Sequence, residues 1–234
     1  MSKDEVWKLE ALLAMFKSSQ LQAMRQLINI GILISGRGTN MDAILAAIKA
    51  GRIKDAKPCV VVSNNTQATG LHIASEKYGV PTKVIVPDKL KGWDYDEKIV
   101  AVLQEHGVTP QFGLVCLAGF MRIISSEFVR HYQNRIMNIH PALLPSFPGL
   151  HAQRQALDYG VKITGCTVHF VDEGVDSGPV IMQKAVDVLD GDDEESLSAR
   201  ILKHEHQLYP EAVRLFSEGR IKIEGRRVSI ILAR

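Results

Sequence analysis

The chain has 234 residues, of which 46% are hydrophobic and 23% charged. This length suits one compact α/β domain, and the composition excludes a disordered or fibrous protein. The formal net charge of +2, without a long run of Lys or Arg, argues against a surface that follows nucleic acid. No apolar stretch is as long as a membrane span, and charges interrupt the first thirty residues, so we expect neither insertion nor export.

The three cysteines, Cys59, Cys116 and Cys166, lie far apart, and each is inside an apolar run. This placement is typical of buried free thiols rather than of a disulfide framework. We therefore predict a cytoplasmic protein.

Residues 1–27 are predicted to form a helical extension, because apolar side chains recur there at helical spacing, at Val6, Leu9, Leu13 and Phe16. Such a helix can dock onto a partner or a second copy, or it can pack against its own domain. We favour the packing role, and Met24 is also a potential start of the chain.

From residue 28 onward, short apolar runs alternate with helical segments. The spacing predicts a strand over 28–34, a glycine-rich loop, a helix over 41–50 and a strand over 59–62. The alternation then continues with a helix over 67–78, a strand over 82–86, a helix over 94–105 and a strand over 112–118. This pattern predicts an α/β fold with a Rossmann-like, mainly parallel twisted sheet and helices on both faces.

The second half of the chain, about 119–234, has longer strands. We predict a helix over 125–132, a strand over 135–139, a proline-rich loop over 141–149, strands over 163–171 and 179–188, a helix over 193–218 and a hairpin over 220–232 centred on Gly225. With the first half, about 28–118, it is expected to form a single domain over 28–234. No internal repeat or low-complexity linker divides it.

Ligands of open α/β sheets bind beyond the carboxyl ends of the strands. The loops that follow Ile34, Ala118, Ile139 and Val171 are therefore expected to converge on one crevice.

The loop Ser35-Gly-Arg-Gly-Thr-Asn40 lies between a predicted strand and a predicted helix, where backbone amides can bind an anion. A dinucleotide site needs glycine at position 41, which is Met, and an NTP-cleaving loop needs a Gly-Lys-Ser/Thr ending. A single phosphate fits better, with Thr39 capping the helix. The alternative is a glycine turn and helix cap without a ligand.

Asn138 and His140 are two apart in a predicted strand, so their side chains share one face while Ile139 points to the other. An amide and an imidazole at a strand exit suit the oxyanion and the proton transfer of acyl-group chemistry. Asp176 could lie opposite and keep the imidazole charged. Alternatively, all three residues could serve turns and loop ends.

Neither of two further chemistries is indicated. The sequence has no Gly-x-Ser-x-Gly nucleophile elbow, so direct transfer is favoured over an acyl-enzyme. His204-Glu205-His206 lies in a predicted helix without the i, i+4 spacing of a zinc site, so no metal is expected.

Four motifs in order resemble the folate-dependent formyltransferase family, and among its members the phosphoribosylglycinamide formyltransferases. They are Ile-Ser-Gly-Arg-Gly-Thr-Asn at 34–40, Leu-Ala-Gly-Phe-Met-Arg-Ile at 117–123, Asn-Ile-His-Pro-Ala-Leu-Leu-Pro at 138–145 and Asp-Ser-Gly-Pro at 176–179. The resemblance runs from about residue 28 to 225 and leaves the N-terminal extension uncovered. It implies formyl transfer from 10-formyltetrahydrofolate to the amine of glycinamide ribonucleotide in purine biosynthesis.

The resemblance also implies the roles of individual residues. The substrate phosphate would lie on Gly38, Thr39 and Asn40, and the ribosyl hydroxyls on Glu205. The folate would contact Met121, Arg122, Ile123 and Ile124, and the loop that begins near Asp172. Asn138, His140 and Asp176 would be catalytic, in a monomer or homodimer without a metal.

One residue departs from the family pattern, and three other classes of protein share parts of it. Lys91 stands where an Arg often binds the folate tail, and it could replace that Arg only as a point charge. A formyltetrahydrofolate hydrolase would need a regulatory domain in front, and a methionyl-tRNA formyltransferase would need a C-terminal RNA-binding domain. A non-catalytic nucleotide-binding module is the remaining alternative, and the three catalytic residue types argue against it.

Overall fold

The computed structural model describes residues 27–232. The helix predicted over residues 1–27 lies outside the described residues except for Leu27, so it stays a prediction. Within the described part, the order of elements follows the predicted one except for one additional helix over 152–159.

The core of the fold is a seven-stranded sheet in the order β3-β2-β1-β4-β5-β6-β7. The strands are β1 (Ile28–Ile34), β2 (Ala56–Ser63), β3 (Thr82–Val84), β4 (Gly113–Leu117), β5 (Ile136–His140), β6 (Ile163–Phe170) and β7 (Val180–Asp187). Strands β3, β2, β1, β4 and β5 pair in parallel, whereas β6 is antiparallel to both of its neighbours. The predicted α/β class and mainly parallel sheet are thus confirmed.

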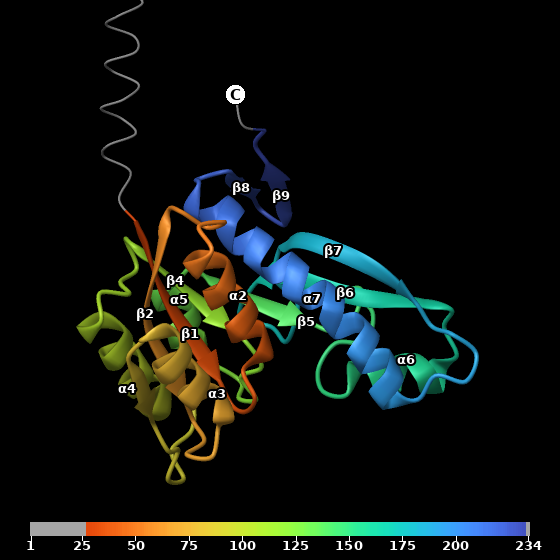
Figure 1. Ribbon diagram of the computed structural model, residues 1–234, viewed down its shortest axis with the longest axis horizontal. Coiled ribbons are helices and arrows are strands. Elements are labelled where there is room, and N and C mark those ends of the chain that lie inside the picture. The colour runs from red at the N-terminus through yellow and green to blue at the C-terminus, as the bar shows by residue number, and fades with distance from the viewer. Residues whose placement is uncertain (1–26, 233–234) are drawn as a thin grey trace, which may run out of the picture.

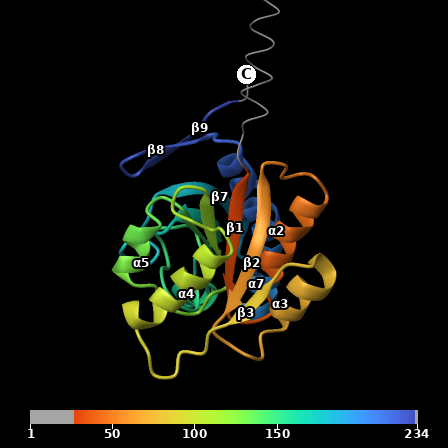
Figure 2. The same cartoon turned by 90° about the vertical axis from the view of Figure 1, so that its left-hand side faces the viewer.

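Helices cover both faces of the sheet (Figures 1 and 2). They are α2 (Thr39–Lys49), α3 (Thr69–His72) with its π-helical continuation η1 (Ile73–Lys77), α4 (Trp93–Glu105), α5 (Ser126–His131), α6 (Ala152–Tyr159) and α7 (Glu194–Ser217). Figure 2 shows α2, α3 and α7 on one side of the sheet and α4 and α5 on the other. A small hairpin, β8 (Ile221–Glu224) and β9 (Arg227–Ile230), follows α7, as predicted.

The two faces carry separate hydrophobic cores, because successive strand residues point to opposite sides. Ile32 and Met137 belong to the core under α2 and α7, whereas Leu33 and Ile136 belong to the core under α4 and α5. Burial of both faces explains why the parallel strands are continuous apolar runs. Polar side chains in these strands therefore need a specific reason to be there.

Helix α6 was not predicted. Its sequence, Ala-Gln-Arg-Gln-Ala-Leu-Asp-Tyr, offers little apolar surface, and only Ala152 and Ala156 are buried. Two alanines one turn apart are too weak a periodic signal to reveal a helix.

The other sequence expectations concern cysteines and membranes. All three cysteines are free and buried, as predicted. Over the range 27–232, no helix is both long and apolar enough to cross a membrane.

Candidate active site

The candidate site lies at the carboxyl ends of β1, β4 and β5, which are adjacent in the sheet. The loops after β1 and β4 touch directly, because the Met121 amide donates a hydrogen bond of 2.8 Å to the Ser35 hydroxyl. Ser35 in turn donates to the side-chain oxygen of Asn64, which follows β2. Three strand ends are thus connected through one hydroxyl group.

The glycine-rich loop leads from β1 into α2. Gly38 has φ of 68°, a left-handed conformation that favours glycine, and it is the residue that precedes the helix. The expectation that Thr39 caps α2 is wrong, because Thr39 is already the first helical residue and no side chain caps this end. The first amides of a helix have no partner within it, so the backbone N–H groups of Gly38, Thr39 and Asn40 can donate hydrogen bonds to an anion.

Asn40 and Glu205 meet although 165 positions separate them in the sequence. The Asn40 side-chain nitrogen donates to Glu205 Oε2 at 2.7 Å, and both side chains are buried between α2 and α7. Burial raises the pKa of Glu205, while the hydrogen bond from Asn40 opposes that rise. The side-chain oxygen of Asn40 is buried and has no partner within the described residues, so it is an acceptor for a ligand hydroxyl.

Asn138 and His140 lie on β5 on the face that also carries Ile136, while Ile139 packs into the opposite core. His140 is buried and Asn138 is half-buried. The strand therefore presents an amide and an imidazole side by side at its exit.

The carboxylate of Asp176 joins this pair. Its Oδ2 lies 3.2 Å from His140 Nδ1 and accepts a hydrogen bond of 2.8 Å from the Gly149 amide. Its Oδ1 accepts a longer hydrogen bond of 3.4 Å from Asn138. Asp176 thus contacts both β5 side chains and the end of the proline-rich loop, and only 14% of its side chain is exposed.

Both ring nitrogens of His140 lie next to oxygen atoms that accept hydrogen bonds. Nε2 lies 2.7 Å from the Phe147 carbonyl oxygen, which can only accept, so this ring nitrogen carries a hydrogen. Nδ1 faces the Asp176 carboxylate, a second group that can accept a hydrogen bond. His140 is therefore held between a carboxylate and a carbonyl.

His169 is a member of the cluster that sequence reasoning missed. It pairs with Asn138 across β5 and β6, and its Nε2 lies 3.3 Å from the Asn138 side-chain nitrogen. Its Nδ1 donates to the Phe170 carbonyl oxygen at 2.8 Å, which leaves Nε2 as the acceptor for Asn138. Burial lowers the pKa of His169, consistent with a neutral ring. Only the antiparallel register could have revealed this contact.

The loop after Val171 reaches the same crevice, as expected, but it starts from the opposite edge of the sheet. Strand β6 is antiparallel to β5, and Phe170 at its end pairs with Met137 near the start of β5. Residues 172–178 must therefore fold back along β5 to bring Asp176 to His140. Asp172 shapes this loop from within, because its Oδ1 accepts hydrogen bonds from the Gly174 amide and the Ser177 hydroxyl.

The segment after β4 offers apolar surface next to this cluster. The side chains of Met121 and Ile123 are 67% and 82% exposed, whereas Ile124 packs partly against the core under α4 and α5. The guanidinium of Arg122 stacks on the Tyr95 ring, 4.3 Å from its centroid, and donates to the Leu90 carbonyl. Arg122 thus contacts Leu90, the residue before Lys91 in the sequence.

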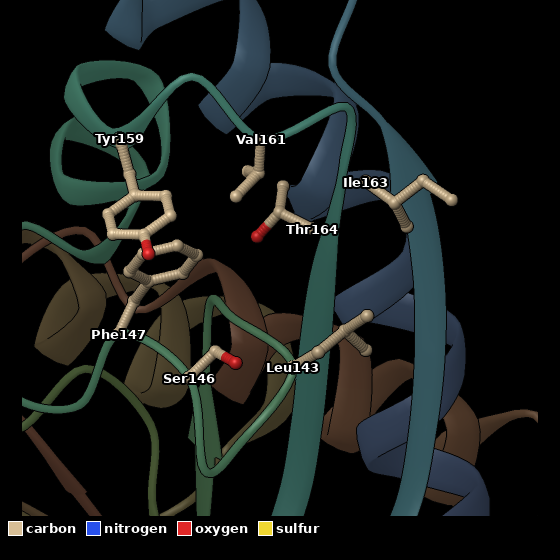
Figure 3. Close-up of a pocket in the computed structure, with 7 residues that line it drawn as sticks. All are labelled: Leu143, Ser146, Phe147, Tyr159, Val161, Ile163 and Thr164. Atoms are coloured by element: carbon tan, nitrogen blue, oxygen red, sulfur yellow. The ribbon is translucent and has the colours of Figure 1, made fainter.

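A cavity of about 360 Å³ lies on the other side of the proline-rich loop. Figure 3 shows its lining residues, Leu143, Ser146, Phe147, Tyr159, Val161, Ile163 and Thr164. None of the predicted site residues lines it. Phe147 connects the cavity to the site, since its ring makes an edge contact with the Tyr159 ring in the cavity wall while its carbonyl contacts His140.

Among the residues that the structure describes, no group of three or more His, Cys, Asp or Glu side chains is arranged to hold a metal ion. The ionisable side chains of the cluster instead contact one another and the backbone.

Comparison with known proteins shows a match of residues 28–213 to the Formyl transferase family model. Over 197 residues the chain is 41% identical to phosphoribosylglycinamide formyltransferase of Escherichia coli (strain K12), covering 84% of this chain and 90% of that protein. It is 43% identical over 212 residues to the trifunctional purine biosynthetic protein adenosine-3 of Drosophila pseudoobscura pseudoobscura, of which it spans only 15%. The crystal structure of glycinamide ribonucleotide transformylase 1 from Symbiobacterium toebii superimposes with a TM-score of 0.82 at 51% identity, over 88% of this chain and 94% of that one.

Proposed function

Because this chain belongs to the formyl transferase family, we propose that it transfers a formyl group from 10-formyltetrahydrofolate to the amine of glycinamide ribonucleotide, a step of purine biosynthesis. The observation that carries this proposal is the cluster of Asn138, His140 and Asp176, which joins an amide donor to an imidazole held by a carboxylate. Such a cluster suits an acyl transfer in which charge develops on a carbonyl oxygen.

The ribonucleotide binds between the glycine-rich loop and α7 in this proposal. Its phosphate accepts hydrogen bonds from the amides of Gly38, Thr39 and Asn40 at the start of α2. Its ribosyl hydroxyls meet the buried pair of Asn40 and Glu205, where an unpartnered acceptor and a carboxylate are available. This arrangement directs the glycinamide amine towards the end of β5.

The formyl folate binds along the segment after β4. Met121 and Ile123 supply exposed apolar side chains for a flat ring system, and Arg122 and Ile124 complete the segment. The loop that begins at Asp172 closes the other side. The cosubstrate itself carries the one-carbon group, and we assign no step to a metal.

The chemistry that we propose starts with attack of the neutral amine on the formyl carbon. A C–N bond forms and the carbonyl electrons move to oxygen, where the side-chain N–H of Asn138 and Nε2–H of His140 stabilise the oxyanion. His140 must exchange the Phe147 carbonyl for this oxyanion. The oxyanion then collapses, the bond between the formyl carbon and N10 of the folate breaks, and N10 takes up a proton.

Two further residues set up these donors. Asp176 stabilises the positive charge of His140 and helps to carry the proton from the attacking amine to the leaving nitrogen through water. His169, as a neutral acceptor, fixes the orientation of the Asn138 amide. The second N–H group of Asn138 donates to Asp176 Oδ1 at 3.4 Å, so it must exchange this carboxylate for the oxyanion.

The rival activity is hydrolysis of formyltetrahydrofolate, in which water replaces the amine. The decisive experiment measures tetrahydrofolate release by the purified protein with and without glycinamide ribonucleotide. We expect release and formylated product only when the ribonucleotide is present. Release at the same rate without it would establish a hydrolase, and no release in either case would reject both activities.

Three properties of this protein stay proposals. The location is proposed to be cytoplasmic, in line with three free buried thiols. The assembly is proposed to be a monomer or a homodimer. The range 28–234 is proposed to act as a single domain, with substrate phosphate bound in its first half and folate in its second.

A further inference from the structure

We propose that Arg226 is a positioning residue that holds the loop carrying Asp176 in its active conformation. Arg226 lies at the turn of the β8–β9 hairpin, and its Nη2 donates a hydrogen bond of 2.7 Å to the carbonyl oxygen of Ser177. Gly225 and Arg226 also border one cavity of about 280 Å³ together with Asp172 and Glu173. The inference rests on the proposed catalytic role of Asp176.

The loop needs such support because of its backbone. Asp176 has a backbone φ of 49°, in the left-handed region that residues other than glycine adopt at a cost in free energy. Asp172 ties the loop together internally through Ser177 and Gly174. Two cations connect the loop to other elements: Arg130 of α5 forms an exposed ion pair with Glu173, and Arg226 binds the Ser177 carbonyl oxygen directly beside Asp176.

The hairpin can serve as an anchor because it is itself fixed. Arg220, which follows α7, forms two hydrogen bonds with the end of the hairpin: the Ile231 amide donates to the Arg220 carbonyl, and the Arg220 side chain donates through Nε to the Ile231 carbonyl. Arg220 also pairs with Glu218 at the end of α7. These bonds connect Ser177, through the hairpin, to α7, the helix that carries Glu205.

Small displacements of Asp176 matter because its contacts have little tolerance. Its hydrogen bond from Asn138 is 3.4 Å long and its distance to His140 Nδ1 is 3.2 Å. A shift of about 1 Å would break both, since hydrogen bonds weaken steeply beyond these lengths. A residue that sets the position of the neighbouring peptide thus acts on the reaction through Asp176.

The test compares Arg226→Ala with the matched control Arg227→Ala in steady-state formyl transfer. Arg227 is the exposed neighbour in the same hairpin, and within the described range its side chain has no hydrogen bond or ion pair. We expect Arg226→Ala to lower kcat by about three- to tenfold, the effect of one lost hydrogen bond, with KM for the ribonucleotide unchanged. Arg226→Lys, which keeps a donor, should recover at least half of the lost rate, and Arg227→Ala should match the parent.

Hydrogen–deuterium exchange of residues 172–178 gives a readout that does not depend on activity. Arg226→Ala should exchange faster there than the parent, whereas Arg227→Ala should not. Equal kcat for the two alanine variants, or unchanged exchange in Arg226→Ala, would overturn the proposal. Failure of the parent protein to formylate the ribonucleotide would reject the proposed function instead. Hydrogen–deuterium exchange would in that case still test whether Arg226 stabilises the loop over 172–178.

Discussion

Individual side chains in the cluster have roles that follow from which atoms can donate and which can only accept. The carbonyl oxygens of Phe147 and Phe170 are acceptors, so they fix hydrogens on His140 Nε2 and His169 Nδ1, respectively. The second nitrogen of each ring lies near Asp176, at 3.2 Å for His140 Nδ1 and at 3.7 Å for His169 Nε2, and burial lowers the pKa of His169. In the proposed mechanism a charged His140 donates to the oxyanion while a neutral His169 orients Asn138.

Asp176→Asn tests this charge assignment. The amide would remove the negative charge that stabilises the His140 imidazolium, so kcat should fall by roughly a hundredfold. KM for glycinamide ribonucleotide should change less than about twofold, because Asp176 does not belong to the proposed phosphate or ribosyl site. Steady-state kinetics with each substrate varied in turn would measure both values.

Glu173→Gln is the matched control for this substitution. It lies in the same loop and loses only an exposed ion pair with Arg130, which is worth about 0–1 kcal/mol. Its kcat should stay close to that of the parent. Full activity in Asp176→Asn would remove Asp176 from the mechanism.

Among the structural elements, the glycine-rich loop depends on a neighbour that the motif does not include. Gly70, in α3, donates its amide to the Gly36 carbonyl, and a Cβ added there would lie 3.1 Å from the Gly38 Cα and 2.7 Å from the Ile34 Cδ1. The loop and α3 are therefore in backbone contact. The close approach explains why this position carries glycine.

Gly70→Ala should displace the loop and weaken phosphate binding. Overpacking of this kind costs about 1–3 kcal/mol, so we expect KM for the ribonucleotide to rise by roughly tenfold or more while kcat changes little. Thr69→Ala, the exposed residue before it in α3, is the control and should leave KM unchanged. An unaltered KM in Gly70→Ala would show that the loop does not hold the phosphate.

For the whole molecule, the family match begins at residue 28, where β1 begins. The residues that we assign to substrates and chemistry all lie within 38–205, in the matched range. We therefore expect removal of residues 1–23 to leave kcat and both KM values within about twofold of those of the full chain. Side-by-side kinetics of the two proteins would test this, and a collapse of activity would show that the extension contributes to the site.

The sequence by itself determined the elements whose signals are local. Apolar runs and helical spacing predicted the elements from β1 to α7 with the exception of α6, and the period of two along β5 placed Asn138 and His140 on one face. The position of the glycine-rich loop between a strand and a helix also followed from neighbouring residues. Such features depend on backbone periodicity, which a short window of sequence contains.

The tertiary structure alone decided which distant side chains complete the site. The contact of Asn40 with Glu205 requires α2 and α7 to pack together, and that of Asn138 with His169 requires the antiparallel register of β5 and β6. Asp176 was placed by family resemblance, and the path of its loop was predicted from the wrong sheet edge. These contacts depend on strand direction and on packing between remote elements, for which a single sequence has no local signal.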